Sequence, residues 1–436
     1  MKTFAPIRDA VSSGAFMTLV VACTTLQSPT REPAMMPAIA QPSSATYHVL
    51  HRFDLFPKQG GAESPAGPLV DVDGTFYGTT HLGGLHGDGT VYSITASGVK
   101  KRLYSFGTNS SDGIKPSAGL IVVNGTLYGV TAFGGTCGSS STGAGGTVFS
   151  ISTTGTENVL HSFCQSDGEN PGSELLAVDG TLYGTTTTAG GTSGNSGGTV
   201  FSMSTSGGFK VLHSFNGAEG DGFSPSGPLL DVNETLYGTT GAGGASDSSG
   251  CDCGTVYSIT TAGKEKVLYS FQGRQQGSDG DTPGGALIDV NGLLYGTTLL
   301  GGRGSCFEKG GCGVVYSITT SGAETVVYRF RSASHGQNPR AGLLDVNGTL
   351  YGTTEWGGGG SCELDSTRFR GCGTIYSLAA SGAEQVLHAF IGGSDGAHPE
   401  ASLIDVNGTL YGTTKEGGFK TRCAGNGCGT VFELSP

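Results

Sequence analysis

The sequence predicts an all-β protein: a seven-bladed β-propeller of four-stranded antiparallel blades, closed by its N-terminal strand. The stretch Leu-Tyr-Gly-Thr-Thr, or a close variant, recurs every 51 to 60 residues, with its tyrosine at Tyr77, Tyr128, Tyr183, Tyr237, Tyr295, Tyr351 and Tyr411. Each repeat contains four short β-type runs, and no segment has helical periodicity of useful length. A four-stranded unit of this size, repeated in tandem, is the signature of a β-propeller.

The second repeat shows the four runs in order. They are residues 120–123, 126–131, 146–152 (GTVFSIS) and 158–163 (NVLHSF). Asn124-Gly125 joins the first two runs, and Asn-Gly supplies the positive φ angles that a two-residue type I′ turn requires. The fourth repeat has Asn233-Glu234 there, and the others have Asp-Gly or Asn-Gly. A short Gly-bearing turn joins the third and fourth runs, so each repeat predicts four antiparallel strands.

The two ends of the array predict that the ring is closed. The array opens with a fourth-type run at residues 48–53 (HVLHRF) and ends with a third-type run at residues 429–434 (GTVFEL). Seven complete blades result only if the N-terminal run completes the last blade, which removes the exposed edges of an open array. The alternative is an open solenoid, which would call for atypical capping repeats. The sequence shows none.

The repeated motifs also resemble a known family. The recurring LYGTT, the Gly-Gly after it, GTV(Y/F)SI, VLHSF and the DGxxPxAxL stretch resemble the GloVer tandem repeat of bacterial choice-of-anchor surface proteins. The resemblance covers residues 46–436 in all seven repeats. It implies a propeller-like protein of the bacterial cell envelope, in a family whose members differ in how they are attached to the cell. It brings no established catalytic residue or cofactor.

The composition favours an exported β-protein over a nucleic-acid-binding one. The chain has 80 glycines, and only 13% of its residues are charged, which suits a protein with many turns. The formal net charge is −12. Because the sequence has no basic stripe that could release phosphate counterions, we expect no nucleic-acid partner.

The N-terminus is typical of an export signal with a lipid attachment site. Lys2 and Arg8 precede an apolar segment at residues 11–22 that is too short to be a permanent transmembrane helix. The segment ends in Leu-Val-Val-Ala-Cys23, which resembles the lipobox of bacterial lipoproteins. Asp9 departs from the usual pattern, and an ordinary cleaved signal is the alternative.

Three segments therefore follow, together with a location. We predict a signal peptide at residues 1–22, a lipid-anchored flexible tether at residues 23–45 and a propeller at residues 46–436. The tether assignment rests on four prolines with Ser, Thr and Gln and no apolar periodicity. The predicted location is extracytoplasmic, in the cell envelope, with membrane contact through the lipid anchor only. We expect a monomer.

The other cysteines fall in equivalent places and form a disulfide pattern. Three pairs lie between second and third runs and are predicted intraloop disulfides: Cys306 with Cys312, Cys362 with Cys372, and Cys423 with Cys428. Cys137 and Cys164 also belong to the disulfide set, while the pairing of Cys251 and Cys253 stays open. Zinc is the competing interpretation, but no repeat supplies four nearby ligands in a CxxC pairing.

Length variation predicts the functional face. In a propeller the second-to-third and fourth-to-first connections emerge on one face, and function usually lies where loops vary. The distance from the repeat tyrosine to the glycine that opens the third run varies from 12 residues in the first repeat to 22 in the sixth. The predicted ligand-binding residues are Trp356, Phe133, His335 and His398, with Glu174, the one charged residue at its inner-strand position.

Trp356 is the leading ligand-binding candidate. It is the chain's only tryptophan, it precedes four consecutive glycines, and its loop is the longest. An exposed indole offers a large stacking surface, and glycine lets a ligand approach closely. The alternative is that Trp356 packs against the neighbouring blade.

Two further columns of the repeat, meaning sets of equivalent positions in the seven repeats, are interpreted as structural. His51, His161, His213 and His388 share one register of the fourth run with Tyr104, Tyr269 and Tyr328, which indicates packing or a repeated hydrogen bond. The Asp-Gly-x-x-Pro stretch carries Asp112, Asp167, Asp221, Asp279 and Asp395, which we expect to close a turn onto backbone amides. Calcium binding by these carboxylates is the alternative, although the alternating DxDxDG pattern is absent. No other metal or cofactor is predicted.

These observations favour a non-catalytic binding or scaffold module with a carbohydrate or protein ligand on the long-loop face. The first alternative is a propeller enzyme, a hydrolase or lyase acting on polysaccharide or a lactone at the channel mouth. No GxSxG occurs in the strand-turn-helix setting that a hydrolase elbow requires. The second alternative is a structural envelope protein.

Overall fold

The computed structural model describes residues 45–436 except 55–60, 139–144, 191–196, 218–219, 245–251, 274–278, 304–305, 307–309, 332, 361, 363–370 and 419–426. These described residues all belong to one compact unit. The predicted signal peptide, Cys23 and the tether up to residue 44 lie outside the described residues. No helix in the described part is long and apolar enough to cross a membrane.

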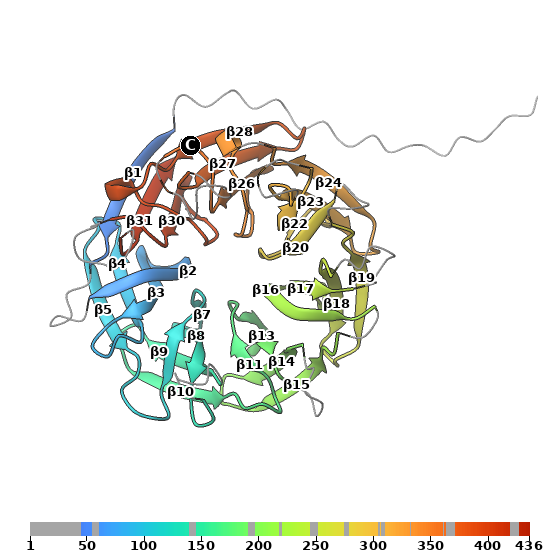
Figure 1. Ribbon diagram of the computed structural model, residues 1–436. Helices are drawn as coiled ribbons and strands as arrows, with labels where there is room; N and C mark the ends of the chain where they lie inside the picture. Colours follow the sequence, from blue (N-terminus) through green and yellow to red (C-terminus); the bar gives the residue numbers. More distant parts are fainter. Residues whose placement is uncertain are drawn as a thin grey trace, which may run out of the picture. The chain divides into compact units, whose positions relative to one another are not determined.

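The compact unit is an all-β, seven-bladed β-propeller, as predicted (Figure 1). The innermost strands are β2 (Ala62–Val72), β6 (Gly113–Pro116) with β7 (Ile121–Val123), β11 (Glu169–Pro171) with β12 (Leu176–Val178), β16 (Gly222–Val232), β20 (Gly280–Pro283) with β21 (Ile288–Val290), β25 (Leu344–Val346) and β29 (Ile404–Val406). The second strands are β3 (Thr75–Gly83), β8 (Thr126–Gly134), β13 (Thr181–Thr188), β17 (Thr235–Gly243), β22 (Leu293–Gly301), β26 (Thr349–Thr354) and β30 (Thr409–Thr414).

The outer half of each blade is equally regular. The third strands are β4 (Thr90–Thr95), β9 (Thr147–Ser152), β14 (Thr199–Ser204), β18 (Thr255–Thr260), β23 (Val314–Thr319), β27 (Thr374–Ala379) and β31 (Thr430–Ser435). The outermost strands are β5 (Lys100–Ser105), β10 (Glu157–Ser162), β15 (Phe209–Ser214), β19 (Glu265–Ser270), β24 (Glu324–Arg329), β28 (Glu384–Ala389) and β1 (Thr46–Arg52). Two 3-10 turns, η2 (Ala333–His335) and η3 (Gly393–Asp395), follow the outermost strands of blades five and six.

The N-terminal strand closes the ring, which confirms the predicted overlap of the two ends. β1 pairs antiparallel with β31, from Thr46 opposite Ser435 to Arg52 opposite Thr430. Blade seven therefore has the strand order β29-β30-β31-β1. Blue β1 lies beside red β31 in Figure 1. Main-chain hydrogen bonds thus join the two ends of the array and remove an open edge.

The hydrophobic core is divided among the seven blade interfaces. The cluster around Phe53, Leu69 and Tyr92 takes residues from blades seven and one, and each other cluster likewise takes its residues from two adjacent blades. A single repeat therefore has no core of its own. Neighbouring repeats must stack to bury these faces.

Cross-strand contacts explain the repeated motifs. A Cβ at Gly78 of the LYGTT motif would lie 2.6 Å from the hydroxyl of Tyr92, because the third-strand aromatic ring of the same blade covers the glycine. In every blade except blade five, which has Val314 there, the last threonine of the motif bonds the threonine that begins the third strand, as in Thr80 Oγ1 to Thr90 Oγ1 at 2.8 Å. The motif residues thus hold each blade together internally.

One main-chain hydrogen bond fastens each blade to the next. The residue before the proline of the Asp-Gly-x-x-Pro stretch has φ between 56° and 59° in all seven blades: Ser64, Lys115, Asn170, Ser224, Thr282, Asn338 and His398. Its N–H donates over 2.7 to 3.0 Å to the preceding blade, just before the third strand. This stretch therefore begins the innermost strand in blades one to five, where only a turn was expected.

Disulfides join connections on the variable face. Cys306 bonds Cys312, Cys362 bonds Cys372, and Cys137 bonds Cys164. The first two pairings agree with prediction. Cys253 and Cys428 are also disulfide-bonded, but Cys251 and Cys423 lie outside the described residues. Cys306–Cys312 and Cys362–Cys372 therefore lie within second-to-third connections, whose lengths differ most between repeats, and Cys137–Cys164 ties such a connection to the one after the fourth strand.

Candidate functional site

A cavity of about 450 Å³ lies on the axis of the ring. All seven blades contribute to its walls, mainly through the residues that follow the interblade prolines. His81 and Leu82 at the end of β3 also line it. Because innermost strands begin and second strands end on the face of the longer connections, the cavity lies at the predicted functional face of the propeller. Its volume is within the range of small-molecule sites.

Charged side chains gather on the side of the cavity formed by blades six and seven. Lys415 Nζ donates to Glu400 Oε1 at 2.8 Å. Arg340 Nη1 lies 3.5 Å from Glu355 Oε2. Burial raises the pKa of the Glu355 carboxyl, and the nearby Glu400 carboxylate raises it further. Two cationic and two anionic groups thus lie side by side at the channel mouth.

Glu174 lines the same cavity from blade three, which agrees with its predicted place beside the channel. Its Oε1 accepts a hydrogen bond from the backbone N–H of Gly119 at 3.3 Å. Burial raises the pKa of the Glu174 carboxyl above its ordinary value. Blade three lies across the ring from blades six and seven (Figure 1). The cavity therefore has an acidic group opposite a mixed-charge wall.

Trp356 is buried, so the expectation of an exposed indole is wrong. Its relative exposure is 7%. The centroid of its ring lies 4.1 Å from that of His398, which is at the start of blade seven. Trp356 also forms an antiparallel β-bridge with Gln337. The predicted alternative, packing against the neighbouring blade, is what the structure shows. The blade interface covers the indole surface that a ligand would need.

His398 is buried in the same interface. Its Nδ1 lies 3.0 Å from the carbonyl oxygen of Glu355, and its Nε2 lies 3.6 Å from Glu416 Oε2. Burial lowers the pKa of the His398 imidazole. Because the imidazole is 3% exposed and bridges two blades, His398 is placed as a packing residue and not at a ligand surface.

The other two predicted residues lie apart from the cavity. Phe133 is half-buried near the end of β8, where Lys115 Nζ lies 5.5 Å from its ring centroid. His335 is on the outer rim in η2, and its Nδ1 lies 2.8 Å from Glu384 Oε2. The structure therefore brings only Glu174, of the five predicted residues, to the axial cavity.

The sequence reasoning missed Arg340, Glu400 and Lys415. A signal for them exists in the repeat columns. The position after the proline is charged only at Arg340 and Glu400, and the position four after the repeat tyrosine carries a formal charge only at Glu355 and Lys415. Comparing these columns across repeats would have indicated a charged wall shared by blades six and seven.

The repeat model of one family matches the described propeller from end to end. The Gloeobacter/Verrucomicrobia repeat matches residues 39–248, 135–309 and 308–436. The chain belongs to the Gloeobacter/Verrucomicrobia repeat family. This confirms the predicted resemblance. No curated protein sequence matches the chain significantly.

Several solved structures are similar to this member of the Gloeobacter/Verrucomicrobia repeat family. The PQQ-bound aldose sugar dehydrogenase of Streptomyces coelicolor is 14% identical over 91% of this chain and 99% of that chain, with a TM-score of 0.44. A gluconolactonase of Xanthomonas campestris is 13% identical over 70% and 86%, with a TM-score of 0.39. Trypanosoma rangeli sialidase is 13% identical over 90% and 59%, with a TM-score of 0.42. Identities this low assign no activity to the chain.

In this Gloeobacter/Verrucomicrobia repeat, four of the fourth-strand His and Tyr residues make the predicted repeated hydrogen bond, whereas His213 lies 3.7 Å from its aspartate and Tyr328 bonds Glu384. The partner of these four is the aspartate of the Asp-Gly-x-x-Pro stretch: Tyr104 with Asp112 at 3.0 Å, His161 with Asp167 at 2.8 Å, Tyr269 with Asp279 at 2.8 Å, and His388 with Asp395 at 3.2 Å. The aspartates of this stretch also accept backbone N–H groups of residues that precede them, as with Thr108 and Asp112, and Asp221 accepts that of the following Gly222 as well. They close the connection after the fourth strand.

Proposed function

We propose that this protein is a non-catalytic binding module, held outside the cytoplasm on a lipid anchor, that takes a short, charged carbohydrate into its axial cavity. The observation that carries the proposal is the cavity of about 450 Å³ with Arg340, Lys415, Glu400 and Glu174 in its walls. Most neutral wall residues are Gly, Ala or Ser, so polar groups of a ligand can reach both the charged side chains and the backbone.

The chemistry of the cavity favours hydrogen bonds and charge over ring stacking. None of the described residues that line it is Phe, Tyr or Trp. A guanidinium and an ammonium group suit carboxylate or sulfate substituents, while Glu174 and Glu400 accept hydroxyl or amino hydrogens. An acidic or amino sugar presents these groups within a few ångströms of one another.

The disulfides of the chain and its membership of this repeat family support the proposed location. Disulfides persist in oxidising compartments outside the cytoplasm, and the chain joins three described pairs of cysteines. The predicted lipobox at Cys23 supplies the anchor. A tether of about 20 residues has a reach of about 25 Å as a flexible coil, which keeps the cavity close to the membrane.

The proposal is tested by screening the purified chain against neutral, acidic and amino oligosaccharides on an array, followed by calorimetry with any hit. Arg340→Ala and Lys415→Ala should each weaken binding at least tenfold without changing the melting temperature. Lys266→Ala, on the exposed outer surface of β19, is the matched control and should bind like the wild type. Binding only to proteins, or affinity unaffected by both cavity variants, would contradict the carbohydrate assignment.

A second candidate function is a hydrolase or lyase acting on polysaccharide or a lactone at the same cavity. The observation that favours it is Glu174, whose pKa is raised by burial, because enzymes raise the pKa of a carboxyl in this way to make it a better general acid. Glu174→Gln separates the two functions. An enzyme would lose turnover, whereas a binding module would show none in either protein.

A further inference from the structure

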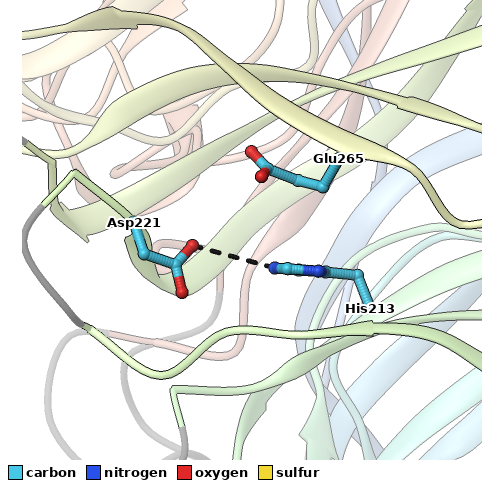
Figure 2. Close-up of side chains that lie close together, drawn as sticks. All are labelled: His213, Asp221 and Glu265. Carbon is cyan, nitrogen blue, oxygen red and sulfur yellow. Dashed lines mark ion pairs between the residues drawn. The ribbon is translucent and has the colours of Figure 1, made fainter.

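Three metal-ligating side chains converge on the outer rim, between blades three and four (Figure 2). His213 comes from β15, Asp221 from the connection before β16, and Glu265 is the first residue of β19. One ligand atom from each lies within 4.8 Å of the others. His213 Nε2 lies 3.7 Å from Asp221 Oδ1, which is too long for a hydrogen bond.

Two of these ligand atoms make no hydrogen bond in the described structure. His213 Nε2 and Glu265 Oε1 are both buried and have no hydrogen-bond partner among the described residues. Leaving such atoms unpaired costs free energy. A shared cation would satisfy both atoms and offset the repulsion between the two carboxylates.

Asp221 is held in position by the backbone. Its Oδ2 accepts the N–H of Asn216 at 2.9 Å, and its Oδ1 accepts the N–H of Gly222 at 2.8 Å. Each oxygen keeps a further lone pair for a ligand. The His213 and Asp221 side chains are 23% and 15% exposed, so an ion and a water molecule can enter from solvent.

Equivalent interfaces with histidine lack the second carboxylate. His161 stacks on Phe209 at 3.8 Å and contacts Asp167 at 2.8 Å. His388 likewise stacks on Tyr47 at 3.7 Å and contacts its own aspartate. Phe209 and Tyr47 occupy the position that Glu265 has in blade four, at or next to the start of the outermost strand. An aromatic partner thus gives a stacked, hydrogen-bonded histidine.

Equivalent interfaces with two carboxylates lack the histidine. Tyr104 lies with Asp112 and Glu157, and Tyr269 with Asp279 and Glu324. A protonated tyrosine is a weak metal ligand compared with imidazole. Among the described residues, the blade three and four interface is the one place that assembles three His, Cys, Asp or Glu ligands.

We propose that His213, Asp221 and Glu265 bind a first-row transition-metal dication that links blades three and four. An imidazole nitrogen with two carboxylate oxygens suits Zn²⁺ and its neighbours, whereas Mg²⁺ and Ca²⁺ prefer oxygen ligands alone. Three protein ligands leave a coordination position for water. The site is on the outer rim, remote from the axial cavity, and does not depend on the proposed function.

The test measures Zn²⁺ bound per chain by equilibrium dialysis and elemental analysis, after chelator treatment and removal of the chelator. His213→Tyr and Glu265→Phe install side chains that the fold already carries at the equivalent positions of other blades, so both variants should fold. Each should bind one Zn²⁺ fewer than the wild type. His161→Tyr, at the interface of blades two and three, is the matched control and should leave the number unchanged.

Two further measurements complete the test. Zn²⁺ should raise the melting temperature of the wild type but not that of Glu265→Phe, because an ion bound only by the native state stabilises it. Phe209→Glu should add one bound Zn²⁺, since it supplies the missing carboxylate beside His161 and Asp167. If His213→Tyr and Glu265→Phe retain the wild-type Zn²⁺ number, the proposal is overturned. If either variant fails to fold, two other results still overturn the proposal. One is that the wild type binds no Zn²⁺, and the other is that Phe209→Glu binds no more Zn²⁺ than the wild type.

Discussion

The backbone N–H of Ser64 donates to the carbonyl oxygen of Cys428 at 2.9 Å. Ser64 lies near the start of β2, the innermost strand of blade one, and Cys428 precedes β31, the third strand of blade seven. The bond is therefore the last of the seven interblade hydrogen bonds, and it forms only when the ring is closed. Tyr47 adds a second contact across the closure, donating its hydroxyl hydrogen to the carbonyl oxygen of Asp395 at 2.6 Å.

Deleting residues 46–53 should destabilise the propeller severely. The deletion removes β1, which pairs with β31 along its length, and it removes Phe53 from the core between blades seven and one. The open edge of β31 should then promote association. We expect a lower melting temperature and aggregates in size-exclusion chromatography. A truncation that removes only residues 1–44 keeps β1 and is the control; equal melting of the two truncations would contradict ring closure through β1.

Trp356→Ala should reduce stability rather than ligand affinity alone. The indole is 7% exposed and packs on His398, and truncating a buried aromatic side chain typically costs about 3 to 5 kcal/mol. Chemical denaturation followed by circular dichroism measures the loss. Leu85→Ala, which changes a side chain 58% exposed on the same kind of connection in blade one, should cost little. If Trp356→Ala is as stable as the wild type but no longer binds carbohydrate, Trp356 belongs to the ligand site after all.

Two half-buried glutamates, Glu157 and Glu324, should make the protein less stable as pH rises. Burial, aided by Asp112, raises the pKa of Glu157 from 4.5 to about 7, and burial with Asp279 does the same for Glu324. Between pH 4.5 and about 7, these carboxyls therefore hold protons in the native state that they have lost in the unfolded chain. Stability contributed by this proton uptake is present below about pH 4.5 and is lost as pH rises toward 7.

Replacing both glutamates tests this dependence. Glu157→Gln with Glu324→Gln should raise the melting temperature at pH 8 relative to the wild type, with little difference at pH 4.5. Glu234→Gln, at an exposed turn, is the control and should have no such pH-dependent effect. Parallel melting curves for the double variant and the wild type across this range would show that the carboxyls titrate normally.

Cys23→Ala should release the protein from the membrane. The prediction rests on the short apolar segment that ends in Val-Val-Ala before Cys23, because a lipid chain on this cysteine would be the attachment. Fractionation of cells that express either form measures the membrane-bound share. Ser28→Ala, five residues further along, controls for changes near the segment. If Cys23→Ala stays membrane-bound to the same extent, the lipobox assignment fails.

The axial cavity shows how far inference from the sequence reaches. Glu174 was identifiable because its column in the repeat is otherwise uncharged. Arg340 and Lys415 were not identified, because each shares its position in the repeat with a second charged residue and so does not stand out as Glu174 does; only the closed ring brings both to one cavity. Trp356 was misjudged for a related reason. Its glycine-rich neighbours indicate a loop, but blade seven, which covers the indole, lies further along the chain.

The repeat by itself determined the strands, their turns, the number of blades and the closure by β1. These features depend on residues close in the chain, such as Asn124 and Gly125 with their positive φ angles, and on the order of runs at the two ends. The tertiary structure decided which equivalent residues differ in role. His161, His213 and His388 share one column, yet their partners are Phe209, Glu265 and Tyr47 from the following blade. Side-chain chemistry at a blade interface depends on two repeats at once, and the register that brings them together exists only in the folded ring.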